Sequence, residues 1–416
     1  MRGKWRILLF TTVCLLCCPR MVHAQEPVII VIDPGHGGKN LGAQYDGYVE
    51  KDMTMVTAMA MKEELERYEN VVVYLTHETD TDLSIKARAQ FAREKEADFL
   101  FCLHYNSSEN HNFYGAEVWV PAYGSLYAKG RAFAEIEMEQ LTEMGLYSRG
   151  IKTRLNDRDE NYYGILRYCS EFDIPSALIE HCHLDHPSDK VFYQQSEEQL
   201  KAFGRADGTA AAKYLGLASP ELGVDYGGYP KMNVEIREDA VRPDKSEPDV
   251  CAIEVQEINE QTGELTVKIE ASDRESYVQY YSYSLDGGRT FSRLEPWPRP
   301  VWYESAPEHV FTADIPLEQN LELCVNAYNG FDFFTESNHI QIEAVSPPGA
   351  EEELPSYEEL HPEELYARDL EGTKAAEQNT LAVLLIFIGI LMILVFLAMV
   401  RMILRLRGSN RRRRRR

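Results

Sequence analysis

The stretch Val28-Ile29-Ile30-Val31-Ile32-Asp33-Pro34-Gly35-His36-Gly37-Gly38 decides the fold of this chain. Its first five residues are all β-branched and apolar, a run typical of a strand that is buried on both faces. Asp-Pro-Gly then predicts a turn that ends the strand. In α/β proteins, turns that follow the carboxyl ends of strands are where ligands bind, so this turn is the first candidate for a functional site.

The alternation of short apolar runs with amphipathic segments continues to Leu217. Further strands are expected at Val71–Leu75, Phe99–Leu103, Ala116–Val120 and Ser176–Ile179. Helices are expected at Glu50–Glu69, Ser84–Lys95, Ser125–Met144 and Ser196–Leu215. Buried strands separated by helices predict an α/β domain over residues 27–217, with a largely parallel sheet flanked by helices.

The pattern changes after this domain. Residues 218–247 are polar and contain proline and glycine, which indicates a linker. Residues 248–343 contain short alternating strands and the hairpin signal Leu285-Asp286-Gly287-Gly288. They resemble a small all-β sandwich of the immunoglobulin-like or fibronectin type III kind, which would act as a spacer or bind a protein partner. Its segment 297–303 is rich in aromatic residues, and either binds sugar or peptide or caps the core of the sandwich.

The two ends of the chain predict export and anchoring. Residues 1–24 combine basic residues, a short apolar run and Val-His-Ala, as a cleaved signal peptide does. Residues 344–379 are a proline- and glutamate-rich acidic stalk, and residues 380–400 are long and apolar enough for a transmembrane helix. Nine arginines follow in the basic tail 401–416. This bias predicts a single-pass protein of the cell membrane, with its C-terminus cytoplasmic and its folded domains extracellular.

Charge and cysteine content narrow the function further. All 67 acidic residues lie between the two ends, whereas 13 of the 43 lysines and arginines lie within residues 1–24 or 401–416. The segment between them is therefore strongly acidic, and nucleic acid is excluded as a partner on electrostatic grounds. Its five cysteines are sparse and odd in number, so they do not form a disulfide framework; Cys251 and Cys324 either pair or remain free thiols.

Three expected strands end in a chemically useful side chain: His36, His104 and Glu180. Glu50 opens the first helix. Because strand ends of a parallel sheet meet at one edge, these residues are expected to lie close together. Two imidazoles and one carboxylate form a three-ligand zinc set that leaves a position for water. We expect His36, Glu50 and His104 to bind Zn²⁺ and Glu180 to act as the catalytic base, although either histidine taken alone is more often a core residue.

Four motifs occur in register: Asp33–Gly38, Val49-Glu50-Lys51-Asp52, Leu103-His104-Tyr105-Asn106 and Leu178-Ile179-Glu180. With them, residues 28–217 resemble the type 3 family of zinc-dependent N-acetylmuramoyl-L-alanine amidases. The resemblance also covers Arg88 and Arg149-Gly150-Ile151-Lys152.

The resemblance implies zinc ligands at His36, Glu50 and His104 and a catalytic glutamate at Glu180. It further implies hydrolysis of the amide bond between N-acetylmuramic acid and L-alanine in peptidoglycan. Asn106 and Arg167 fall where the family has polar groups near the site, so each either binds substrate or holds a loop.

The chain also departs from the family pattern. After Glu180 it has His181-Cys182-His183-Leu184-Asp185-His186, which is either a second metal site or a loop that reshapes the cleft. Residues 151–164 are too few for the helical insertion that closes the zinc site in some relatives, so an open site is expected. Two alternatives to an active amidase remain: an inactive wall-binding or scaffold protein, and a zinc peptidase that acts on stem peptides.

Overall fold

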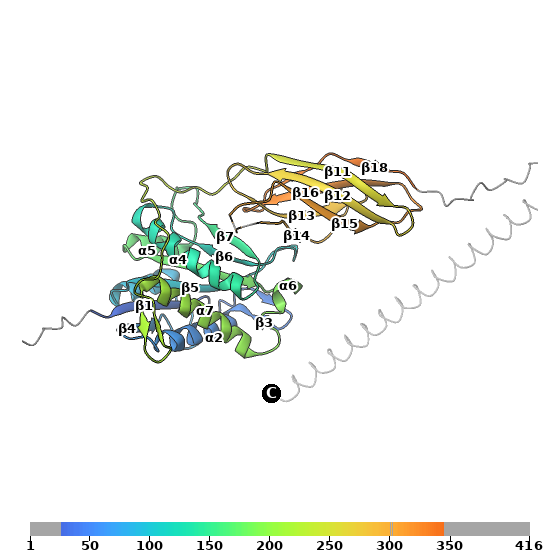
Figure 1. Ribbon diagram of the computed structural model, residues 1–416. Coiled ribbons are helices and arrows are strands. Elements are labelled where there is room, and N and C mark those ends of the chain that lie inside the picture. The colour runs from blue at the N-terminus through green and yellow to red at the C-terminus, as the bar shows by residue number, and fades with distance from the viewer. Residues whose placement is uncertain (1–25, 300, 302, 345–416) are drawn as a thin grey trace, which may run out of the picture. The chain divides into compact units, whose positions relative to one another are not determined.

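The computed structural model describes residues 26–299, 301 and 303–344 (Figure 1). The expected signal peptide, acidic stalk, transmembrane helix and basic tail lie outside these residues. Within the described part of the chain, no helix combines the length and the apolar character needed to cross a bilayer.

A six-stranded sheet with the strand order β4-β1-β5-β8-β6-β7 forms the centre of the first part of the chain. Its strands are β1 (Val28–Pro34), β4 (Val71–Leu75), β5 (Phe99–Asn106), β6 (Ala116–Trp119), β7 (Ser148–Lys152) and β8 (Ser176–His183). β4, β1, β5 and β8 are mutually parallel, as expected. β6 and β7 run in the opposite direction, so the sheet is mixed rather than largely parallel.

The reversal at β6 has a simple physical cause. Only nine residues, 107–115, connect β5 to β6, and they contain no helix. A parallel crossover needs about a dozen residues or more to return the chain to the starting edge. The short connection therefore leaves the next strand antiparallel. The sequence pattern identifies strands but carries no information on their direction.

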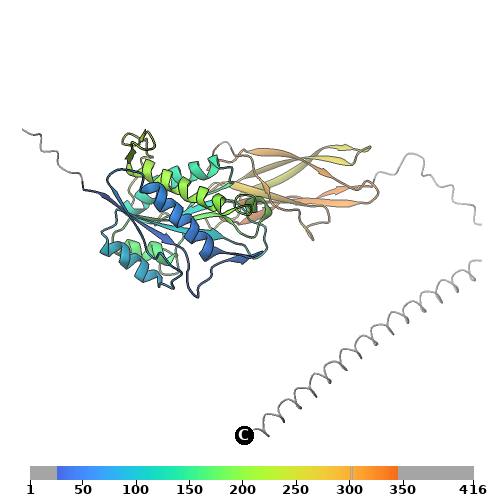
Figure 2. The same cartoon turned by 90° about the horizontal axis from the view of Figure 1, so that it is seen from below.

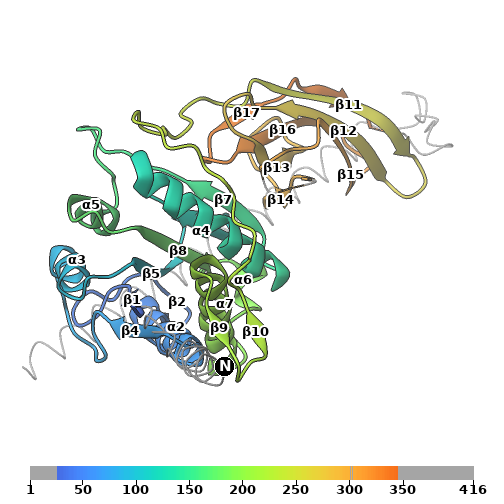
Figure 3. The same cartoon turned by 60° about the vertical axis from the view of Figure 1, so that its left-hand side comes forward.

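Helices cover both faces of the sheet (Figure 3). One face carries α2 (Glu50–Leu65), α4 (Gly124–Glu143) and α7 (Glu197–Leu215), and the other carries α3 (Ile85–Glu94) and α5 (Gly164–Glu171). The shorter elements of this part are α6 (Pro187–Lys190), β2 (Gln44–Tyr45), β3 (Tyr48–Val49), β9 (Ala218–Ser219) and β10 (Val224–Asp225).

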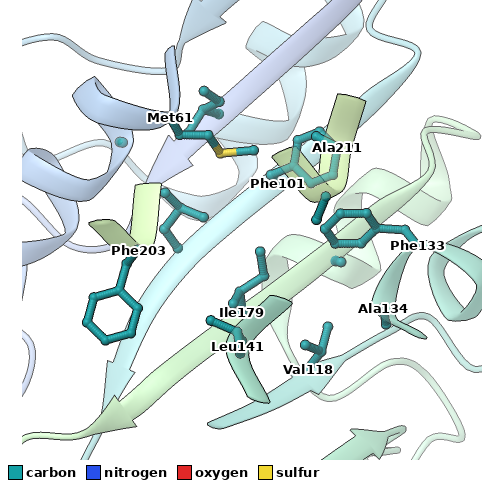
Figure 4. Close-up of a cluster of buried hydrophobic side chains, with 14 of the residues drawn as sticks. Met61, Phe101, Val118, Phe133, Ala134, Leu141, Ile179, Phe203 and Ala211 are labelled. Carbon is teal, nitrogen blue, oxygen red and sulfur yellow. The ribbon is translucent and has the colours of Figure 1, made fainter. Parts of the chain in front are cut away.

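β5 shows how two cores arise from one strand. Phe99, Phe101 and Leu103 pack into the larger core with residues of α2, α4 and α7. Figure 4 shows Phe101 among Met61 of α2, Phe133 of α4 and Ala211 of α7. Leu100 and Cys102 alternate with them and pack into the core beneath α3 and α5. Because successive side chains of a strand point to opposite faces, a continuous apolar run is required wherever both faces are covered.

The helices α2 and α7 lie side by side in close contact (Figure 2). Gly204 of α7 makes this approach possible, since a Cβ at that position would lie 2.2 Å from the carbonyl oxygen of Thr57. The close packing fixes α2, which begins at Glu50 and thereby sets the position of that carboxylate relative to the sheet.

Residues 250–342, the β-rich region, form two antiparallel sheets around a shared hydrophobic core. One sheet consists of β11 (Val250–Asn259), β12 (Glu264–Ser272) and β15 (Glu308–Asp314). The other consists of β13 (Val278–Ser284), β14 (Glu295–Pro296), β16 (Leu321–Asn329), β17 (Phe334–Glu336) and β18 (Ile340–Ile342). The segment expected as a linker contains β9 and β10, and its residues Leu222 and Val224 pack against the core of the α/β part.

Two open questions from the sequence are answered in the β-rich region. Cys251 and Cys324 are both free thiols. Trp297 is 1% exposed, packs in the shared core and donates a hydrogen bond from Nε1 to the Ala306 carbonyl at 2.9 Å. This residue of the aromatic segment therefore caps the core.

Candidate metal and catalytic site

The turn after β1 presents His36. This residue adopts a left-handed backbone conformation with φ of 68°, which is unusual for a side chain other than glycine. Arg88 of α3 fixes the turn: its Nη1 donates to Asp33 Oδ1 at 2.9 Å and to the Pro34 carbonyl at 2.6 Å, and its Nη2 donates to the His36 carbonyl. The buried guanidinium thus holds a strained turn in place, and with it the position of His36.

Glu50 is the centre of the site. Its carboxylate accepts hydrogen bonds from the backbone N–H of Ala43 at 2.7 Å and of Tyr105 at 3.1 Å. His36 Nε2 lies 2.9 Å from Oε2, and His104 Nδ1 lies 2.9 Å from Oε1. Burial alone would raise the pKa of this carboxyl, but the hydrogen bonds from His104 and His36 lower it well below its usual range. Glu50 is therefore ionised at neutral pH.

His36, Glu50 and His104 can together hold one metal ion. The donor atoms of all three residues lie within 4.8 Å of one another. Gly42 packs directly against this group: a Cβ there would lie 2.4 Å from Glu50 Oε2, so a larger residue would displace the carboxylate. His36 Nδ1 is hydrogen-bonded to Asn40 Oδ1 at 2.9 Å, which leaves Nε2 for the ion. Two nitrogens and one carboxylate oxygen fit the ligand preference of Zn²⁺.

Glu180 lies next to this group on β8. It is the direct neighbour of His104 in the parallel pairing of β5 with β8. Its side chain is 9% exposed, and its Oε2 has no hydrogen-bond partner within the described part of the chain. Burial, together with the nearby carboxylates of Glu50 and Glu117, raises its pKa well above the usual range. A buried carboxylate with a free oxygen and a raised pKa is suited to accept a proton during catalysis.

A cavity of about 410 Å³ gives access to all four residues, and Asn106 also lines it. Residues 153–163 contain no helix, so no helical plug from this segment covers the site. Arg167 does not line the cavity. It donates from Nη1 to the carbonyls of Asn161 at 2.8 Å and Tyr162 at 3.0 Å, so it holds a loop.

Comparison with known proteins agrees with this geometry. The model of the N-acetylmuramoyl-L-alanine amidase family matches residues 30–209. The N-acetylmuramoyl-L-alanine amidase CwlM of Bacillus licheniformis is 31% identical over 188 residues, which are 44% of this chain and 68% of that protein. The sporulation-specific N-acetylmuramoyl-L-alanine amidase of Bacillus subtilis gives the same identity and the same coverage. The chain belongs to the N-acetylmuramoyl-L-alanine amidase family.

Among solved structures, one amidase catalytic domain is similar to part of this chain. The catalytic domain of the amidase CwlV from Bacillus (Paenibacillus) polymyxa var. colistinus is 25% identical, with a TM-score of 0.40, over 46% of this chain and 99% of that one. Family membership rests on the sequence matches. These end at residue 209 for the family model, so the β-rich region lies outside the matched part of this amidase.

The amidase contains one buried charged cluster next to the site that the sequence did not predict. Glu117 of β6 is buried, and its Oε2 accepts from Arg149 Nε at 3.0 Å and from Lys152 Nζ at 2.7 Å. Its Oε1 accepts from Asn106 Nδ2 at 3.0 Å, so the cluster reaches the rim of the cavity. The feature of the sequence that pointed to this cluster was the basic motif Arg149-Gly150-Ile151-Lys152. Its carboxylate partner stands in an apolar strand more than thirty residues earlier.

The residues after Glu180 in this amidase do not form a second metal group. His181 is buried, and its Nε2 lies 2.9 Å from Asp207 Oδ2 while its Nδ1 lies 2.9 Å from the His104 carbonyl. Within the described ranges, the three-donor groups close enough for a metal contain none of residues 181–186. His181 instead ties the strand that carries His104 to α7.

Proposed function

We propose that this amidase uses a zinc ion to hydrolyse the amide bond between N-acetylmuramic acid and L-alanine in peptidoglycan. The observation that carries the proposal is the convergence of His36, Glu50 and His104 beside Glu180, in a chain that belongs to a family of peptidoglycan amidases. Each of these side chains comes from a different element, so their meeting is a property of the fold.

Bound zinc would lower the pKa of a water molecule toward about 7 and polarise the scissile carbonyl. The chain's own residues perform the proton transfers. Glu180 takes the proton of the attacking water on its free oxygen and delivers it to the nitrogen of the departing L-alanine. Burial of Glu180 supports this role, since it brings the affinity of the carboxylate for a proton closer to that needed at neutral pH.

We also propose that the amidase is exported and anchored in the cell membrane. The apolar residues 380–400, followed by nine arginines, support this arrangement. The two sheets of the β-rich region support an immunoglobulin-like sandwich placed between the catalytic part and the anchor. Fractionation of cells tests the location: recovery of the full-length protein in the soluble fraction would contradict it.

Digestion of purified peptidoglycan by the full-length protein tests the activity, with and without a chelator. We expect release of intact peptides with free L-alanine amino termini, loss of release after chelation and recovery on addition of zinc. Cleavage within the stem peptide would indicate a peptidase instead. Bound zinc with no release of peptide would indicate a scaffold protein.

A further inference from the structure

A second cleft adjoins the metal cavity. It has a volume of about 510 Å³ and shares Asn106, Ser107 and Tyr163 with the cavity of the catalytic residues. The α/β part forms one side of this cleft, through β6, β7 and the residues after them. The β-rich region forms the other side through residues 331–333, in the turn between β16 and β17. The two cavities therefore adjoin at Asn106, Ser107 and Tyr163.

The wall contributed by the β-rich region is held by buried contacts. Arg149, which is 3% exposed, donates from Nε to Glu117 of β6 at 3.0 Å and from Nη2 to Asp332 at 2.8 Å. The hydroxyl of Tyr277 donates to the Arg149 carbonyl at 2.7 Å, and the hydroxyl of Tyr280 donates to the Tyr114 carbonyl. Arg149 is buried whereas Asp332 is 34% exposed, so this ion pair is partly shielded from solvent, and with the two tyrosine hydrogen bonds it gives the cleft a defined shape.

Each carboxylate that lines the cleft accepts hydrogen bonds from neighbouring residues. Glu117 accepts from Arg149 and Lys152, and Asp332 accepts from Arg149. Asp244 accepts from Ser246, Ser276 and Asn329. The charges of Glu117 and Asp332 are thus balanced by cations, whereas Asp244 keeps its negative charge, because its hydrogen-bond donors are all neutral.

Two other cations line the same cleft and, unlike Arg149 and Lys152, are not paired with a carboxylate in the described part of the chain. Arg154 and Lys245 are both exposed, and neither forms an ion pair with a carboxylate within the described residues. The guanidinium of Arg154 lies over the ring of Tyr162, 3.8 Å from its centroid, which orients it without neutralising it. In a chain with 67 acidic and 43 basic residues, two unpaired cations beside the catalytic cavity mark a local site for negative charge.

Aromatic side chains complete the cleft. Trp119 is packed against Tyr163, with ring centroids 5.0 Å apart. On the opposite side, Phe331 and Phe333 come from the β-rich region, and Phe333 is 40% exposed. Such walls bind aliphatic groups, whereas the two cations bind carboxylates.

We infer that this cleft is the subsite for the peptide portion of the substrate, with Arg154 and Lys245 binding its carboxylates and Phe333 packing against its aliphatic parts. The inference rests on the proposed amidase function, which makes a peptide the leaving group. The glycan portion is a poorer occupant, because N-acetylated sugars joined to peptide through an amide carry no negative charge. The β-rich region is thus part of the substrate site.

Binding of a product-type peptide to the full-length protein tests this without requiring turnover. The probe is a synthetic peptide with an N-terminal L-alanine and free carboxylates, compared with the same peptide in which every carboxylate is amidated, by calorimetry. We expect the free acid to bind at least about fivefold more tightly, and more weakly as salt is raised. Equal binding of the two peptides, or binding of N-acetylated sugars in place of either, would overturn the inference.

Exposed residues provide the variants, which are expected to fold normally. Lys245→Gln and Arg154→Gln should each reduce the preference for the free acid, whereas Lys129→Gln, an exposed lysine away from the cleft, should retain it. Phe333→Ala should weaken binding of both peptides, with the adjacent exposed Phe334→Ala as its control. An unchanged preference in the Lys245 and Arg154 variants overturns the inference even if peptidoglycan is cleaved. Failure to cleave peptidoglycan with normal peptide binding overturns the amidase proposal alone.

Discussion

Two buried glutamates, Glu180 and Glu117, face each other across neighbouring strands of the same sheet and behave in opposite ways. They are direct partners in the antiparallel pairing of β8 with β6. Glu117 is surrounded by Arg149, Lys152, Asn106 and Trp119, all of which donate hydrogen bonds to it. Glu180 has an unpartnered oxygen and lines the metal cavity.

The difference lies in the partners, because burial is common to both. Burial raises the pKa of each carboxyl. At Glu117 the charges of Lys152 and Arg149 outweigh burial and lower the pKa well below its usual value, so the residue is a fixed negative charge that holds the structure together. At Glu180 the nearby carboxylates of Glu50 and Glu117 add to the effect of burial, and the charge of Arg149 opposes them without outweighing them, so the pKa stays well above its usual value. A strand position therefore becomes reactive where the fold leaves its charge uncompensated.

Removal of a proposed metal ligand beside Glu180 should lower activity more than any other substitution. His104→Ala leaves Glu50 with one imidazole, so we expect loss of bound zinc and no detectable release of peptide. Zinc content by mass spectrometry and dye release from labelled peptidoglycan provide the two measurements. His111→Ala, which alters an exposed histidine, is the matched control. Full activity in a metal-free His104→Ala protein would refute the assignment of the site.

Replacement of the proposed base should lower turnover without loss of zinc, which distinguishes it from the proposed ligands. Glu180→Gln retains the shape of the side chain and all three ligands but cannot accept a proton, so zinc should remain while turnover falls by about 10²–10⁴-fold. Because the native carboxylate is buried without compensation, the free energy of unfolding should stay the same or rise. A variant that loses zinc together with activity would show that Glu180 is a ligand and not a base.

Glu117→Gln should give the opposite pattern. An amide in place of the carboxylate leaves the buried cations of Arg149 and Lys152 without a counter-charge, which costs about 3–5 kcal/mol of stability. Denaturant unfolding at pH 7 measures this cost. Any loss of activity should follow the unfolded fraction, and stable Glu117→Gln protein would contradict the role assigned to the cluster.

The comparison of Glu117 with Glu180 also explains which parts of the site could be predicted from the sequence. The proposed ligands His36, Glu50 and His104 and the proposed base Glu180 were indicated by local motifs at strand ends and at the start of a helix. The helices were indicated by amphipathic segments between the strands. Glu117 was not, because an acid between apolar residues in a short strand is typical of an exposed position. Its burial depends on Arg149 and Lys152 of a strand that pairs with β6 only after folding.

Local sequence patterns also could not predict the direction of β6 or the wall of the cleft formed by residues 331–333. Strand direction depends on a connection length whose consequence appears only when β6 pairs with β8. The wall depends on an ion pair between Arg149 and Asp332, which lie 183 residues apart. For Arg167 the sequence left two roles open, binding substrate or holding a loop. Its hydrogen bonds to the carbonyls of Asn161 and Tyr162 are those of a residue that holds a loop.

Acid titration of stability gives the smallest expected effect and bears directly on the comparison. The pKa of Glu117 is lower in the folded protein than its usual value of 4.5, so its contribution to stability is complete above about 4.5. As pH falls below that value, the unfolded chain takes up the proton first and the contribution is lost. The unfolding free energy of the wild type should therefore decline between pH 5 and about pH 3, and the slope for Glu117→Gln should be shallower over the same interval.

Glu180 should affect the pH dependence of stability in the opposite direction. Its raised pKa means that protonation favours the folded state, so the slope for Glu180→Gln should be steeper than that of the wild type. Identical slopes in the two variants would mean that partners do not distinguish these carboxylates.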